Sequence, residues 1–230
     1  MKSIFPLLFC CFFLLPYLVK AQSGTESPVP YFRYSATAGA GVAQLLGDSD
    51  QRRIGAAVYL RGNYFLTHGL SVGLELQEGL LRAGGHEERG AETENFFHTG
   101  VIGVTFQPVK FLQDDHLRRI EYRKSYGIRA LESAYIGAGI GGIYSVQIKH
   151  DGQLRDNMGL SYLFNANLGI ELPLHSLKPN LLDSYIWNLI VNAQANFALD
   201  DELDRYHNQT AITESNDKYI LLTVGVNLRF

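Results

Sequence analysis

Two short stretches carry the letters of motifs that perform known chemistry. Residues 137–142, Gly-Ala-Gly-Ile-Gly-Gly, contain the G-x-G-x-x-G spacing of a dinucleotide-binding loop, which requires a strand before it and a helix after it. Residues 69–73, Gly-Leu-Ser-Val-Gly, contain G-x-S-x-G, whose serine must lie on a sharp turn from strand to helix. Both stretches continue instead as strand patterns. The sequence therefore predicts neither a cofactor site nor a serine nucleophile there.

The histidines likewise predict no functional site. The seven histidines are scattered without the spacing of a metal site, so no metal ligands are predicted. His98 falls on a predicted outward strand face, and Thr99 or Ser161 are the hydroxyl groups that a hydrolytic centre could use with it. No His-x-Ser pair is present. We therefore expect no catalysis.

Five charged residues fall on the strand face that is otherwise small or polar, and they are Arg33, Arg61, Glu75, Glu171 and Arg229. If that face is enclosed, burying each charge costs several kcal/mol unless it is paired. The sequence thus predicts a network of ion pairs inside the fold. The alternative, that these charges are solvated in a water-filled interior, stays open.

The strands that position these residues are clearest at the C-terminus. Between Tyr219 and Phe230, every second residue counted back from Phe230 is apolar, and the other set is mostly polar or small. Because successive side chains of a strand point to opposite faces, this period of two predicts a strand between an apolar and a polar environment. A soluble sandwich and a membrane barrel both fit that pattern.

Eight segments repeat it: Phe32 to Leu46, Ile54 to Leu66, Leu70 to Leu80, Phe96 to Phe106, Ala134 to Ile148, Leu160 to Leu172, Tyr185 to Leu199, and Ile220 to Phe230. Most run about 11 to 15 residues, longer than the roughly five or six of soluble strands and enough to cross a bilayer at a tilt of about 45°. Aromatic residues gather near the segment ends, as in the girdles of membrane barrels. The sequence therefore favours an all-β fold, an eight-stranded antiparallel up-and-down transmembrane β-barrel over residues 31–230.

The N-terminus predicts export. Lys2, an apolar run from Ile4 to Val19 and Ala21 form the pattern of a signal peptide, residues 1–21, cleaved after Ala21 and followed by a linker over residues 22–30. Both cysteines lie within this peptide, which leaves no thiol in the mature chain. Loss of Lys2 and Lys20 reduces the 20 basic residues to 18 against 23 acidic ones, a net charge near −5 that does not predict nucleic-acid binding.

Together, the signal peptide, the eight alternating segments and the terminal Phe230 resemble the OmpA/OmpX class of small outer-membrane barrels. The resemblance covers the mature chain and implies a bacterial outer-membrane location with contacts to lipid and lipopolysaccharide. It also implies that Phe230 is an insertion signal read by the barrel assembly machinery. In that class the interior is filled by side chains, so we expect the ion pairs and amides to plug the lumen without an open pore.

The resemblance leaves the function open between three classes. The leading expectation is a structural or interaction role in the cell envelope. The turn Gln107–Ser133 is long and charged for this class, so an alternative is a barrel subunit of a type IX-like secretion or gliding apparatus. A periplasmic protein partner would then dock on the basic residues of this turn, Lys110, Arg118, Arg119, Arg123 and Lys124. A lipid A-modifying enzyme using His98 is the minor alternative.

Overall fold

The computed structural model describes residues 32–46, 51–84, 92–112, 126–149, 154–174, 185–199 and 217–230. The predicted signal peptide and linker lie outside these ranges. Within them the chain forms β1 (Tyr34–Leu46), β2 (Gln51–Thr67), β3 (Leu70–Gly84), β4 (Glu92–Phe106), α2 (Pro108–Leu112), α4 (Tyr126–Glu132), β5 (Ala134–Lys149), β6 (Leu154–Pro173), β7 (Ile186–Ala198) and β8 (Lys218–Arg229).

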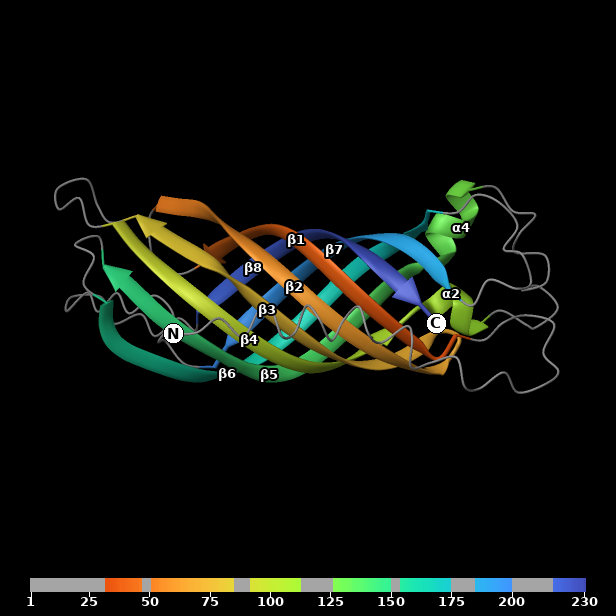
Figure 1. Cartoon of the computed structure of the whole chain (residues 1–230), viewed down its shortest axis with the longest axis horizontal. Coiled ribbons are helices and arrows are strands. Elements are labelled where there is room, and N and C mark those ends of the chain that lie inside the picture. The colour runs from red at the N-terminus through yellow and green to blue at the C-terminus, as the bar shows by residue number, and fades with distance from the viewer. Residues whose placement is uncertain are drawn as a thin grey trace.

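The strands close into a single barrel (Figure 1). Each strand pairs antiparallel with its neighbour in sequence, and β1 also pairs with β8. At the closing seam, the backbone N–H groups of Tyr34 and Phe230 each donate to the carbonyl oxygen of the other residue, at 3.0 Å. The predicted eight-stranded antiparallel barrel is confirmed.

The two faces of the wall have opposite chemistry. On β7 the inward set includes four amides, Asn188, Asn192, Gln194 and Asn196, and all four are buried. The outward residues of the barrel are mainly large and apolar, and many are exposed, as Ile140 is at 70% and Leu160 at 78%. Slipping any strand by one residue would exchange these faces, so the alternation fixes the register.

A closed barrel with a polar inside and an apolar outside is stable only where lipid surrounds it, because strands cross a bilayer only when no edge is left unpaired. Aromatic rings at one end of the wall also indicate a membrane environment. The ring of Tyr34 lies between those of Tyr64 and Phe230, at centroid distances of 5.4 and 6.0 Å. The architecture is that of a bacterial outer-membrane protein, which confirms the predicted outer-membrane location.

The predicted turn Gln107–Ser133 contains the two short helices, which the sequence pattern did not predict. Figure 1 shows α2 and α4 beyond the strand ends, at the end of the barrel where the C-terminus lies. We call this the helical end. Gln107 N–H donates to the carbonyl oxygen of Gly69 at 2.7 Å, which fixes the start of α2 on the β2–β3 turn. No helix among the described residues is long and apolar enough to span a membrane.

Candidate functional site

The middle of the lumen, the space enclosed by the eight strands, is occupied by a central cluster of Arg61, Glu75, Gln77 and Gln194. Arg61 and Glu75 are opposite each other on β2 and β3 and form an ion pair, with side chains only 8% and 7% exposed. The Nε2 groups of Gln77 and Gln194 donate to Glu75 Oε1 at 2.6 and 2.7 Å. Gln77 Nε2 also donates to Gln194 Oε1 at 2.7 Å. One buried carboxylate therefore accepts from three side chains on three strands.

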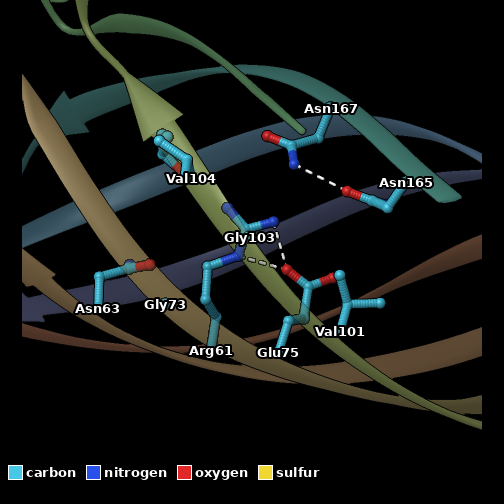
Figure 2. Close-up of a pocket in the computed structure, with 10 residues that line it drawn as sticks. Arg61, Asn63, Gly73, Glu75, Val101, Gly103, Val104, Asn165 and Asn167 are labelled. Carbon is cyan, nitrogen blue, oxygen red and sulfur yellow. Dashed lines mark hydrogen bonds and ion pairs between the residues drawn. The ribbon is translucent and has the colours of Figure 1, made fainter. Parts of the chain in front are cut away.

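Amides extend the central cluster across the lumen. Asn165 Nδ2 donates to Asn196 Oδ1 at 2.7 Å, and Asn167 Nδ2 donates to Asn165 Oδ1 at 2.9 Å. Figure 2 shows Asn165 and Asn167 facing Arg61 and Glu75 across a small cavity of about 20 Å³. That volume is about the room of one water molecule.

A second group, the rim cluster, lies at the helical end and consists of Arg229, Glu171, Gln107 and Ser133. Arg229 forms an ion pair with Glu171, although β7 separates their strands, and Arg229 Nη2 donates to Gln107 Oε1 at 3.4 Å. The guanidinium lies 4.6 Å from the ring centre of Phe65. Ser133 Oγ donates to the backbone carbonyl oxygen of Glu171, so the start of β5 and the end of β6 are joined there.

Two further polar contacts lie in the lumen between the two clusters. Tyr135 donates its hydroxyl hydrogen to Asn192 Oδ1 at 3.0 Å, and Asn227 Nδ2 donates to Thr37 Oγ1 at 2.8 Å. A cavity of about 10 Å³ lies between Arg61 and Glu171. Polar side chains thus line the lumen from the rim cluster to Gln77.

Beyond Gln77, toward the opposite end, the interior contains an apolar layer alongside buried polar residues such as Asn95 and Asn196. Leu81, Phe97, Ile143 and Leu221 are almost fully buried and belong to one hydrophobic cluster. Tyr219 joins this apolar layer to the polar part: its ring centre lies 5.2 Å from that of Phe97, and its hydroxyl donates to Gln77 Oε1 at 3.0 Å. Sequence analysis missed this layer, although these residues fall on the inward set of each strand.

The predicted site residues therefore do not gather in one place. Arg61 and Glu75 meet in the central cluster, and Glu171 and Arg229 meet in the rim cluster. Arg33 was also predicted on the inward face, but it precedes β1 and is exposed. Lys110 lies on α2, whereas Arg118, Arg119, Arg123 and Lys124 lie outside the described residues.

The two literal motifs adopt strand structure. Residues 137–142 lie within β5 and Ser71 lies within β3, buried and facing the lumen. A side chain at Gly137 or Gly139 would collide with Asn167 or Val101, which come from the neighbouring strands β6 and β4. Among the described residues, no group of three or more His, Cys, Asp or Glu side chains could hold a metal ion.

On the outward face, His98 pairs with Glu78 rather than with a hydroxyl group. His98 Nδ1 lies 3.0 Å from Glu78 Oε1, and the two residues are directly opposite on β4 and β3. Thr99 and Ser161, the hydroxyl groups considered for a hydrolytic centre, are both buried on the inward face. The wall separates them from His98.

Solved structures that resemble this chain are small β-barrels. The attachment invasion locus protein Ail of Yersinia pestis aligns over 87% of this chain and 100% of its own, with 11% identity and a TM-score of 0.48. Ail in complex with the heparin analogue sucrose octasulfate aligns over 87% and 100%, with 12% identity and a TM-score of 0.47. Neisserial surface protein A aligns over 86% and 97%, with 12% identity and a TM-score of 0.47.

No protein-family model and no curated protein matches the sequence. At the identities and TM-scores above, the structural likeness carries no argument about function. The membrane assignment rests on the closure of this barrel and the chemistry of its two faces.

Proposed function

We propose that this outer-membrane barrel does not conduct and has a structural or interaction role in the cell envelope. The observation that carries the proposal is the filling of the lumen. The central cluster fills the middle of the lumen with an ion pair and amides. The apolar layer, which includes Leu81 and Leu221, fills the lumen beyond it toward the opposite end. Eight-stranded barrels have an interior just wide enough to be filled in this way.

Conductance in planar bilayers tests this proposal. The folded protein, verified by its mobility without boiling, is added to a bilayer alongside a wide porin as the positive control. We expect no conductance steps from this protein under conditions where the porin gives them. A steady conductance that grows with the amount of folded protein would contradict a closed lumen and favour the water-filled interior.

The proposal includes lipid and lipopolysaccharide on the wall and recognition of Phe230 by the barrel assembly machinery. Phe230 supports it because its backbone closes the β1–β8 seam against Tyr34. We expect Phe230→Ser to reduce assembled barrel in cells while leaving refolding in detergent nearly intact, with Phe106→Ser as the matched control. Equal losses in both settings would assign Phe230 a role in folding alone.

A second candidate is a subunit of a secretion or gliding apparatus that binds a periplasmic protein at the helical end. It is supported by the fixed position of both helices, since Gln107 contacts Arg229 and Ser133 contacts Glu171. A photo-crosslinker at Arg119 should then capture one defined periplasmic protein, whereas one at Thr67, the last residue of β2, should not. The same yield from both positions would count against a dedicated docking segment.

The proposed role is not catalytic. The outward neighbours of His98 are Phe96 and Gly100 on β4 and Glu78 on β3, which carry no hydroxyl group, and Tyr144 on β5, which carries a phenol rather than the hydroxyl of a serine. This arrangement does not favour the lipid A-modifying alternative. Incubation of the folded protein with lipid A, followed by mass spectrometry, should return the lipid unchanged, and a loss of acyl chain that His98→Ala abolishes would establish an enzyme.

A further inference from the structure

The two helices at the helical end expose large apolar side chains. On α2 these are Val109, Phe111 and Leu112, and on α4 they are Ile128 and Leu131. Leu112 is 78% exposed and Leu131 is 68% exposed. The helices have only 5 and 7 residues, so much of their combined surface is apolar. A concentration of this kind on a protein surface marks an interaction site.

The opposite sides of the helices are fixed to the barrel. Ala130 is buried, and Ser133, directly after α4, donates to the carbonyl oxygen of Ala130 at 2.7 Å as well as to that of Glu171. A side chain at Gly69 would collide with the backbone and Cβ of Phe111, so α2 lies directly on the β2–β3 turn. The apolar residues therefore point outward from anchored helices.

The exposed surface is continuous with the lipid-facing wall. The ring of Phe111 meets that of Phe106 edge to face, with centroids 5.2 Å apart. Phe106 belongs to the outward set of β4, where it lies opposite Leu70 of β3 and Ile136 of β5. The same apolar environment that covers Phe106 thus reaches the first helix.

The helices also occupy the part of the rim where Phe106 is the one aromatic residue among the outward residues at the described ends of β3 to β6. At the helical end, Trp187, Phe230, Tyr34 and Tyr64 form an aromatic arc over β7, β8, β1 and β2. The outward residues at the ends of β3, β5 and β6 are aliphatic, and α2 packs beside β5 while α4 packs beside β6. The helix residues stand where the second half of an interfacial girdle would lie.

We propose that α2 and α4 lie in the membrane interface of the inner leaflet and bury Val109, Phe111, Leu112, Ile128 and Leu131 at the boundary of headgroups and acyl chains. Amphipathic segments bind this boundary by inserting their apolar face about 5–10 Å. The occupant is lipid, because the exposed surface continues the lipid-facing wall through Phe106. The inference goes beyond the proposed envelope role, and a conducting lumen would leave it unchanged.

Fluorescence quenching in nanodiscs with one barrel per disc tests the inference. Both cysteines, Cys10 and Cys11, lie in the predicted signal peptide, and the chain from residue 22 onward contains none. Leu112→Cys and Leu131→Cys are therefore each labelled with an environment-sensitive dye. Leu74→Cys on the wall is the lipid reference, and Thr67→Cys at the exposed end of β2 is the water reference. Heat-dependent mobility confirms that each variant is folded.

We expect brominated lipid to quench the dyes at Leu112 and Leu131 to an extent comparable with Leu74. Iodide in the buffer should quench them less than the dye at Thr67. Iodide quenching equal to that at Thr67, with no effect of bromine, would overturn the inference. Shielding from iodide that appears only with two barrels per disc, or only after periplasmic extract is added, would also overturn it, because the occupant would then be a protein.

Discussion

Replacing Glu75 by glutamine removes the counter-charge of Arg61 and leaves the side-chain volume almost unchanged. Arg61 is buried in the lumen with its side chain only 8% exposed, and Glu75 also accepts hydrogen bonds from Gln77 and Gln194. Removing one partner of a buried ion pair costs about 3–5 kcal/mol, because the remaining charge stays unpaired and desolvated. An exposed pair contributes about 0–1 kcal/mol. For Glu75→Gln, a lumen filled by side chains therefore predicts a loss of unfolding free energy several kcal/mol larger than a water-filled lumen does.

Urea unfolding in detergent micelles measures this difference. The fluorescence of Trp187, the single tryptophan, reports unfolding because its side chain lies on the outward wall. Glu78→Gln is the matched control: it lies on the same strand but faces outward, with its side chain 40% exposed, and should cost less than about 1 kcal/mol. The double variant Arg61→Met with Glu75→Gln should recover much of the loss. If Glu75→Gln costs no more than Glu78→Gln, the lumen is water-filled and the buried-pair argument is refuted.

Two further substitutions test the faces of the wall by the same assay. Val224→Arg on the outward face of β8 should cost about 2–4 kcal/mol, as expected at the bilayer midplane. Leu160→Arg near the end of the wall should cost about 0–1 kcal/mol. Equal costs would contradict the placement of Val224 at the midplane and of Leu160 near the membrane boundary. Gly39→Val should cost about 1–3 kcal/mol because the new side chain would collide with the ring of Tyr59, whereas Gly62→Val has open space around its Cβ and should be nearly neutral. A larger loss from Gly62→Val than from Gly39→Val would contradict the assigned inward and outward faces.

The barrel could be predicted because the bilayer imposes its pattern on every strand. The predicted segment Leu70 to Leu80 matches the start of β3, but the strand continues to Gly84. β4 likewise begins at Glu92, before the predicted Phe96. At these ends the outward residues Arg82 and Glu94 form an ion pair at 3.0 Å. Once the outward face meets headgroups or water, apolar alternation is no longer required, so the pattern ends before the strand does.

The pairing of Arg61 with Glu75 could have been read from the hairpin. A turn over Thr67 to Gly69 is centred on His68, and Arg61 and Glu75 are each seven positions from that centre, which agrees with their observed register. No such rule pairs Arg229 with Glu171, because β7 lies between their strands. That contact depends on the curvature of the closed barrel, which a sequence pattern does not contain.

The helices and the apolar layer were missed for different reasons. α2 and α4 have 5 and 7 residues, too few for a helical period to be recognised. The apolar layer was visible as inward leucine, isoleucine and phenylalanine residues such as Leu81 and Phe97. It was overlooked because a polar interior is the usual pattern for this class. Near one end of a narrow barrel, apolar packing fills the lumen equally well.

Electrophoretic mobility of the membrane-fraction protein, with and without boiling, tests the central claim most directly. A closed barrel whose backbone hydrogen bonds are all satisfied between strands resists detergent until it is heated. The account predicts a compact, fast-migrating form without boiling and a slower form after it. A single mobility in both samples, with the protein in the soluble periplasmic fraction, would contradict the membrane-spanning barrel and assign the apolar faces to a soluble fold.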